Sequence, residues 1–488
     1  MSTVRSYPDV QNFIAGSFSQ NGHDRVPVYS PLTGDQISTV PNSSASDLDA
    51  AVQAAKKAFP EWSATPIKER VQIFYRYKTL LEAELEDLGR TVHEENGKTL
   101  GESIAEVAKS IELTEFACSM PQIVPGEIME VSKGVECRTE RKPLGVVACI
   151  APFNFPHMVP HWTVPNAIAL GNTVILKPSE LVPISAGRMA EMLKEAGLPD
   201  GVFNVVHGGK DTVEAICDHP GIEAVSFVGS TRVAKIVYKR ATSTLKRCVA
   251  LGGAKNHLLV LPDAHVGMTA SNVAASMSGC AGQRCMAASA MVGIGPVDHI
   301  VEALCEEARK IVPGDNLGSV ISAEAKERIE RYITEAEAQG AKVLVDGRGT
   351  SVPGHEGGYY VGPTVLDYVK PEMAIAQEEV FGPVLSIMRA DSLEQALEIE
   401  NSSEYGNAAA VFTQSGGLAR EVMERASAGM VGVNIGVPVP REPFGFGGWN
   451  ASKFGVCDIT GRSSIEFWTQ IKKTTTKWNP EARTNWMS

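Results

Sequence analysis

The sequence lacks the features that would tie it to a nucleic acid or a membrane. Its 488 residues carry a formal net charge of −12, and no cluster of Lys and Arg is dense enough to bind a phosphate backbone, which argues against a nucleic-acid partner. Residues 1–22 contain neither a continuous apolar run nor an Arg- and Ser-rich amphipathic pattern, so we expect no signal or transit peptide. The most apolar region, 145–178, is interrupted by asparagines, histidines and prolines, and we do not expect it to span a bilayer.

Cysteine spacing of the kind that builds a disulfide framework or a zinc site is also missing. The nine cysteines are scattered without a repeating interval, and the close pair among them is Cys280 and Cys285. An odd number of irregularly spaced cysteines predicts neither a disulfide scaffold nor a metal site. We therefore expect no bound metal and a location in the reducing cytoplasm.

The usual dinucleotide fingerprint, Gly-x-Gly-x-x-Gly after a strand, does not occur in the first α/β half, and we find no internal repeat. What the sequence does contain is ordinary globular composition, with 43% hydrophobic and 21% charged residues. Because a domain usually takes roughly 100–200 residues, the length predicts about three domains.

The first hundred residues read mainly as helix, and the pattern changes after the third helix. Ser46 is a candidate N-cap for a first helix, a second helix begins after Pro66, and a third covers about 101–118. From 131 to 142 the pattern becomes short extended segments, which predicts an arm outside the main fold.

From Gly145 onward, apolar strands alternate with helices in two series. Strands recurring every 20–30 residues with helices between them predict parallel sheets covered on both faces. The first series has expected strands at 145–150, 173–176, 202–206, 224–228 and 247–251, with helices at 185–196 and 231–241. The second has strands at 257–261, 288–294, 341–345 and 408–413, helices at 297–311, 323–339 and 392–402, and an extended tail at 464–474.

Two strand ends carry residues suited to a nucleotide. Gly229 and Ser230 stand at a strand-to-helix junction, where free N–H groups and a glycine favour a pyrophosphate; the plainer alternative is an ordinary N-cap. Lys177 and Glu180 follow another strand and could bind ribose hydroxyls, and the carboxylate would repel a 2′-phosphate, favouring NAD over NADP. Taken alone, this second segment is a charged loop before a helix.

Two further segments carry groups for acyl chemistry. Asn154 lies among aromatics and prolines in Ala151–Pro156, and a rigid amide is a good oxyanion donor, although loop asparagines are commonly turn residues. Cys285 has small neighbours that leave room for a substrate, whereas an inert buried cysteine is the commoner case. Arg284 could lower the pKa of a neighbouring thiol or bind an anionic substrate.

The order and identity of these segments resemble the NAD-dependent aldehyde dehydrogenase superfamily from about Asn12 to Trp478. The specific signature is Glu378-Glu379-Val380-Phe381-Gly382-Pro383-Val384. Within that superfamily the chain is similar to the CoA-acylating methylmalonate- and malonate-semialdehyde dehydrogenases, through Pro152–Pro156, Gly253-Ala254-Lys255-Asn256-His257 and Gly282-Gln283-Arg284-Cys285-Met286.

The resemblance implies a role for each matching residue. Cys285 would be the nucleophile and Asn154 the oxyanion donor, while Arg284 would bind the substrate carboxylate. A second carboxylate-binding arginine of this branch is replaced here by Lys109, which keeps the charge and loses the bidentate fork. The implied NAD-binding set is Phe153, Lys177, Glu180, Gly229, Ser230, Leu251, Glu379 and Phe381.

One departure from the wider superfamily decides the expected reaction. The water-activating glutamate of hydrolytic relatives is Ala250 here, about 35 residues before Cys285. We therefore predict acyl transfer to coenzyme A, by which malonate semialdehyde would give acetyl-CoA and methylmalonate semialdehyde propionyl-CoA. The alternatives are a hydrolytic, broad-specificity aldehyde dehydrogenase giving a free acid, and a catalytically silent binding protein.

The resemblance also implies an architecture of two parallel-sheet α/β domains and a small β arm. We expect the NAD-binding domain in 1–123 and 144–250, the catalytic domain in 251–449, and the oligomerisation arm in 124–143 and 464–488. An arm with exposed strand edges predicts a homodimer or homotetramer.

Overall fold

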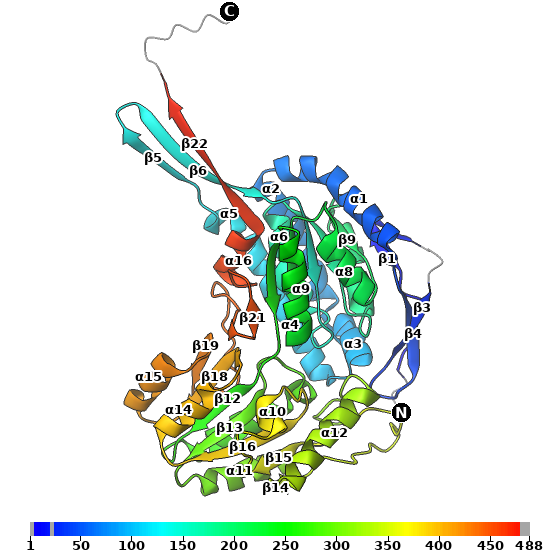
Figure 1. The fold of residues 1–488 in the computed structure, drawn as a ribbon. Helices are drawn as coiled ribbons and strands as arrows, with labels where there is room; N and C mark the ends of the chain where they lie inside the picture. The colour runs from blue at the N-terminus through cyan, green and yellow to red at the C-terminus, as the bar shows by residue number, and fades with distance from the viewer. Residues whose placement is uncertain (1–3, 20–23, 479–488) are drawn as a thin grey trace, which may run out of the picture.

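The fold is built on two parallel-type sheets and a separate three-stranded arm (Figure 1). The computed structural model describes residues 4–19 and 24–478. The first sheet has the strand order β2-β1-β9-β8-β7-β10-β11-β21, in which the five strands from β9 to β11 run parallel. Its strands are β1 (Asn12–Ile14), β2 (Ser17–Ser19), β7 (Val146–Ile150), β8 (Thr173–Lys177), β9 (Phe203–Val205), β10 (Ala224–Val228), β11 (Arg247–Leu251) and β21 (Lys453–Phe454).

Helices cover both faces of this sheet because its central strands are apolar on both sides. Val147 and Cys149 of β7 pack into one buried cluster, whereas Val146 and Ala148 pack into another on the opposite face. The first cluster contains side chains of α2 (Ile67–Ala83), α3 (Leu85–Asn96), α4 (Leu100–Cys118), α5 (Met120–Ile123), α6 (Met158–Ala169), α7 (Ile184–Glu195) and α16 (Gly461–Trp468). The second contains side chains of α1 (Ala45–Ala64), α8 (Lys210–Asp218) and α9 (Thr231–Ser243).

The second sheet has the order β14-β15-β16-β13-β12-β18-β19 and is parallel except for its edge strand β14. Its strands are β12 (Asn256–Val260), β13 (Ala288–Ile294), β14 (Lys342–Val345), β15 (Thr364–Asp367), β16 (Val384–Ala390), β18 (Ala408–Phe412) and β19 (Met430–Val433). Its helices are α10 (Val266–Ser278), α11 (Asp298–Arg309), α12 (Ala323–Ala338), α13 (Ala374–Gln377), α14 (Leu393–Asn401) and α15 (Gly416–Arg425), and two small pairs, β3 (Arg25–Tyr29) with β4 (Gln36–Pro41) and β17 (Tyr405–Gly406) with β20 (Trp449–Asn450), complete the strands of the body.

The arm joins segments that are more than 300 residues apart in the sequence. Strand β22 (Thr469–Lys477) pairs antiparallel with β6 (Val135–Pro143) along its whole length, and β6 pairs with β5 (Glu127–Ser132). Figure 1 shows these strands projecting from the body. Every residue of β5 is exposed, including the apolar Ile128 and Met129.

Two local predictions are wrong, and packing or capping explains each. The stretch 464–468 is helical and not extended, because α16 buries Ile465, Phe467 and Trp468 and Ser464 Oγ accepts a hydrogen bond from Asn166 Nδ2 (3.2 Å); the arm strand begins at Thr469.

The N-cap of α1 is Ser44 and not Ser46, because Ser44 and Asp47 form a reciprocal capping box. The other expected strands and helices are confirmed within a few residues, and β15, β16 and β19 are additional strands that the sequence patterns missed. Residues 1–3, 20–23 and 479–488 of the expected domain ranges lie outside the described residues. In the described part of the chain, no helix is both long and apolar enough to cross a membrane.

Candidate active site

A cavity of about 960 Å³ lies at the carboxyl ends of the strands of the first sheet, where open α/β sheets bind ligands. Residues that follow β7, β8, β10 and β11 line one side of it, and residues near the start of α12 and after α13 line the other. Of the predicted site residues, nine line this cavity: Phe153, Asn154, Lys177, Glu180, Gly229, Ser230, Cys285, Glu379 and Phe381.

The loop that carries Cys285 has an unusual backbone. After α10 the chain places Cys280 and Ala281 at φ 51° and 52° and Gly282 at φ 71°, all in the left-handed region. A Cβ at position 282 would lie 2.0 Å from the main-chain oxygen of Gly382, so glycine is required there both by conformation and by space. This turn brings Cys285 into the cavity.

The main chain of Cys285 is fixed by two amides from the second sheet. Asn256 Nδ2 at the start of β12 and Asn407 Nδ2 beside β18 each donate a hydrogen bond of 2.8 Å to the Cys285 carbonyl oxygen. Asn407 gave no sequence signal, since it stands before an ordinary buried strand. Asn256 belongs to a motif noted in the sequence, but its function could not be assigned from spacing.

The thiol of Cys285 is held in its protonated form by its surroundings. Burial, and then the neighbouring Glu379 carboxylate, raise the pKa of Cys285 to about 12. Burial likewise raises the pKa of Glu379 to about 7, against the opposing effect of the Ala254 N–H, which donates to Glu379 Oε1 at 2.9 Å. The cavity therefore holds a carboxyl group that can gain or lose a proton near neutral pH.

Asn154 is buried beside the Cys285 loop. Its Nδ2 donates to the Gln283 carbonyl oxygen at 3.0 Å, two residues before Cys285. Because an amide NH₂ carries two donors, the second hydrogen remains for a substrate oxygen. The chemistry that this arrangement allows is stabilisation of an oxyanion formed next to the sulfur.

The opposite end of the cavity fits a dinucleotide. Helix α9 begins here with Ser230 as its N-cap, and within the described residues no side chain caps its first N–H groups, which leaves them free for a pyrophosphate. Lys177 Nζ and Glu180 Oε2 form an ion pair of 2.9 Å, which orders the two side chains expected at the ribose. Phe153 and Phe381 meet edge to face, with ring centroids 5.8 Å apart.

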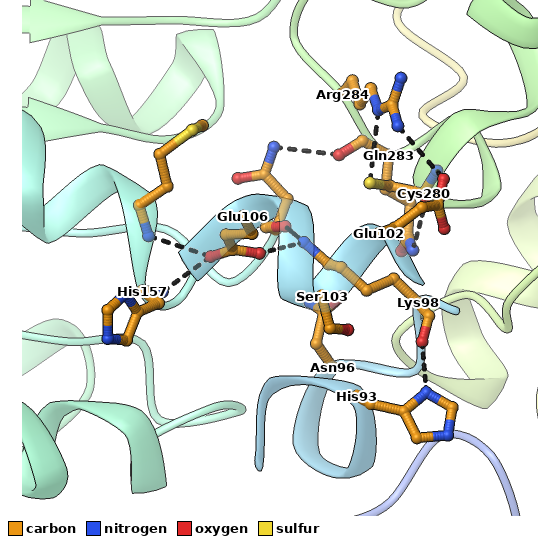
Figure 2. Close-up of polar contacts among 12 residues, drawn as sticks. His93, Asn96, Lys98, Glu102, Ser103, Glu106, His157, Cys280, Gln283 and Arg284 are labelled. Carbon is orange, nitrogen blue, oxygen red and sulfur yellow. Dashed lines mark hydrogen bonds and ion pairs between the residues drawn. The ribbon is translucent and has the colours of Figure 1, made fainter. Parts of the chain in front are cut away.

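The remaining predicted site residues lie outside the lining. Leu251 is buried under it. Arg284 Nη2 pairs with Glu102 (3.1 Å) and its Nε donates to Cys280 Sγ (3.3 Å), as Figure 2 shows. Lys109 pairs instead with Glu112 and Glu442 (2.9 and 2.8 Å). Neither cation lines the cavity, and each already has a carboxylate partner.

The structure also shows where Ala250 lies relative to the cavity. Ala250 has no exposed surface and packs in the core cluster beneath β11, so it contributes no group to the cavity. In the described part of the chain the carboxylates that line the cavity are those of Glu180, Glu214, Glu324 and Glu379, and Glu379 is the one that acts on the charge state of Cys285.

Comparison with known proteins places this architecture. The model of the aldehyde dehydrogenase family matches residues 18–474. A malonate-semialdehyde dehydrogenase of Geobacillus thermodenitrificans is 45% identical over 478 residues, covering 96% of this chain and 99% of the relative. A second, from Geobacillus kaustophilus, is also 45% identical over 96% of this chain and 99% of the relative.

Solved structures agree with these sequence relatives. The methylmalonate-semialdehyde dehydrogenase of Oceanimonas doudoroffii superposes with a TM-score of 0.96 at 40% identity, covering 98% of this chain and 99% of that one. A Sinorhizobium meliloti protein assigned to the same activity and solved with NAD has a TM-score of 0.96 at 39% identity, covering 99% and 100%. With its cysteine loop, its two sheets and this likeness along nearly its whole length, the chain belongs to the aldehyde dehydrogenase family.

Proposed function

We propose that the protein oxidises malonate semialdehyde, methylmalonate semialdehyde or both with NAD, and transfers the acyl group to coenzyme A with loss of CO₂. The observation that carries this proposal is a half-buried cysteine in the cavity combined with Ala250 at the position of the usual water-activating glutamate. The names of the similar proteins support the substrate class.

The first step is attack by the Cys285 sulfur on the aldehyde carbon, with the thiol proton passing to the Glu379 carboxylate in the same cavity. The resulting hemithioacetal oxygen is negatively charged, and the Asn154 amide and the Cys285 main-chain N–H would donate to it. Loss of one such donor typically costs about 2.7–4 kcal/mol of barrier. When NAD is bound, its nicotinamide supplies the hydride acceptor, and Cys285 is left as a thioester.

The fate of the thioester depends on which nucleophile can be deprotonated. Bulk water has a pKa of about 15.7 and needs a base, which Ala250 does not provide. A thiol with a pKa of about 8.5 already contains a few per cent of thiolate at neutral pH. Coenzyme A is therefore the favoured acceptor, with acetyl-CoA or propionyl-CoA as the product.

Decarboxylation follows from the substrate chemistry. Oxidation of the semialdehyde creates a thioester carbonyl β to the carboxylate that the substrate already carries. This carbonyl can accept the electron pair released with CO₂ as an enolate, which then takes up a proton. Arg284 and Lys109 are the cations proposed to bind that carboxylate. To do so they would exchange the carboxylates of Glu102 and Glu442 for that of the substrate.

A second candidate is hydrolysis to the free acid, and one observation favours it. Glu379 lies in the cavity with Cys285 and has a pKa of about 7, which suits a general base. In this reading Glu379 would replace the missing glutamate and activate water against the thioester.

One experiment separates the two candidates. NADH formation from purified protein and malonate semialdehyde is measured with and without coenzyme A, and the products are identified by mass. Sustained turnover that requires coenzyme A and yields acetyl-CoA supports acyl transfer. Turnover to a free acid without coenzyme A, lost in Glu379→Gln, supports hydrolysis.

The setting of the enzyme is part of the same proposal. All nine cysteines are free, which suits a reducing cytoplasm. The fully exposed strand β5 presents Ile128 and Met129, and we expect a second copy of the chain to cover them in a homodimer or homotetramer. Ile128→Glu with Met129→Glu should lower the mass measured by light scattering; an unchanged mass would contradict this assembly.

A further inference from the structure

A buried lysine outside the cavity lining contacts the loop of Asn154. Lys98 is 1% exposed, and its Nζ donates to Glu106 Oε2 at 2.5 Å and to the main-chain oxygen of Asn154 at 2.7 Å. The same ammonium lies 4.0 Å from the centroid of the Phe155 ring. Figure 2 shows Lys98 extending toward Glu106, with Glu106 between it and His157.

Glu106 holds the other end of the same loop. Its Oε1 accepts the N–H groups of His157 (2.8 Å) and Met158 (3.0 Å), which begin helix α6. These N–H groups have no partner within the helix, so the carboxylate acts as their cap from across the fold. The ion pair therefore fixes the loop at Asn154 and again where the loop enters α6.

A third contact from the same segment completes the attachment. Asn96 Nδ2 donates to the main-chain oxygen of Phe153 at 2.8 Å. The carbonyls of Phe153 and Asn154 are thus both held by residues 96–98, at the junction of α3 and α4. Because the main chain on each side of the Asn154 Cα is fixed, the direction of its Cα–Cβ bond is fixed as well, and the hydrogen bond to Gln283 then orients the amide.

The segment 96–98 also contacts the support of the nucleophile loop. Ser319 donates its N–H to the Gly97 oxygen at 2.9 Å, and the Gln283 side chain accepts from the Ile321 N–H at 3.0 Å. Gln283 is the residue whose carbonyl receives the Asn154 amide. One short segment therefore positions the amide and, through 319–321, the loop that carries the sulfur.

A buried ion pair is costly to desolvate and is weak grounds for a stabilising function, because apolar residues of similar volume often do as well. What apolar residues could not provide is a donor to the Asn154 carbonyl and an acceptor for the first turn of α6. Lys98 and Glu106 therefore lie where the loop that carries Asn154 needs directional hydrogen bonds.

We propose that Lys98 and Glu106 are positioning residues for Asn154, holding its amide in line with the oxygen that becomes negative when Cys285 attacks the aldehyde. This inference rests on the proposed function, in which Asn154 is the oxyanion donor. Lys98 does not touch the substrate and acts through Asn154.

The test is a double-mutant cycle read in a single turnover of NADH formation. Lys98→Met alone would leave the Glu106 charge buried and could unfold the protein, so the principal variant is Lys98→Met with Glu106→Gln. This variant is uncharged and keeps an acceptor for the α6 N–H groups. We expect the rate of hydride transfer to fall about 100-fold, as for a misplaced catalytic group. NAD affinity and the rate of Cys285 alkylation by iodoacetamide should stay unchanged.

The cycle is closed by combining these changes with Asn154→Ala. If Lys98 and Glu106 act through Asn154, the triple variant should be as slow as Asn154→Ala, within about threefold. Multiplicative losses would overturn the inference while leaving Asn154 as oxyanion donor. Full activity of Asn154→Ala would instead overturn the oxyanion assignment in the proposed function, and the inference with it.

Lys246→Met serves as the matched control. Lys246 is also buried (6% exposed), and its Nζ donates to the main-chain oxygen of His219 at 2.7 Å. It precedes β11, whose other end borders the cavity, and it does not line the cavity. The Lys246→Met variant should be less stable to unfolding, whereas its rate of hydride transfer should be unchanged. An equal fall in hydride transfer for this control would show that the effect at Lys98 is a general consequence of removing a buried lysine.

Discussion

Glu379 lies directly against Gly253: a Cβ at position 253 would be 2.4 Å from the Glu379 Oε2. The contact matters because the same carboxylate lies in the cavity with Cys285 and accepts the N–H of Ala254. The absence of a side chain at 253 is what lets Glu379 reach this position.

Gly253→Ala should therefore displace Glu379 without unfolding the protein, because the displaced atoms are at the end of a flexible side chain. We expect loss of the hydrogen bond to Ala254, worth about 1 kcal/mol, and a raised KM for NAD. Steady-state kinetics and thermal unfolding check this. Gly416→Ala is the control, since a Cβ there meets nothing within 4 Å. Equal behaviour of the two variants would contradict the contact.

Glu379→Gln should make the Cys285 thiol more acidic. Burial is the larger cause of its raised pKa, and the Glu379 charge adds to it, so removing the charge lowers the pKa of Cys285. In the native protein without NAD, alkylation should keep rising between about pH 7 and pH 10, because the thiolate fraction grows with pH. In Glu379→Gln the profile should shift to lower pH, and a shift to higher pH would sink the idea.

Gly282→Ala should cost both activity and stability. A Cβ there would combine a left-handed backbone with a 2.0 Å approach to the Gly382 oxygen. Gly134→Ala separates these effects, because Gly134 also has a positive φ (73°) but meets nothing within 4 Å. We expect the free energy of unfolding to fall by about 1–2 kcal/mol at position 134, from conformation alone, and by more at position 282. Denaturant unfolding measures both, and comparable losses would argue against the steric contact.

Glu180→Gln should relax the preference for NAD. Glu180 pairs with Lys177 in the cavity, and its charge would repel a 2′-phosphate. Without that charge, kcat/KM for NADP should rise roughly 10-fold relative to NAD, equivalent to about 1.4 kcal/mol. The ratio of kcat/KM values with the two cofactors is the measurement, and an unchanged ratio would remove Glu180 from cofactor selection.

Much of this fold was predictable because strands of parallel sheets are long apolar runs. Segments such as 224–228 and 288–294 were located within a residue. Strand β19, at the sheet edge, is a short Gly-containing stretch that shows no such run. For the stretch 464–468 the extended prediction is wrong because five residues with three apolar side chains fit either period, and packing against α6 decides for helix.

Some site residues could likewise be predicted from the sequence, and others could not. Motif residues such as Cys285 and Asn154 could be found because their chemistry is local. Lys98 and Glu106 could not, because a Lys and a Glu eight positions apart ordinarily describe a solvated helix face. What makes them notable is burial at 1% and 3%, which depends on the packing of α3, α4 and α6. Arg284 was identified, yet its pairing with Glu102 needed the tertiary structure.

Asn256 in β12 and Asn407 directly before β18 hold the Cys285 carbonyl from the second sheet, whereas Asn154 follows a strand of the first. The sulfur and the amide are thus positioned by different sheets, and their alignment depends on how the two sheets pack against each other. A substitution between the two sheets that rotates one against the other would misalign Cys285 and Asn154 without contacting either residue. In such a variant the rate of hydride transfer would fall before the stability of the protein to unfolding changed.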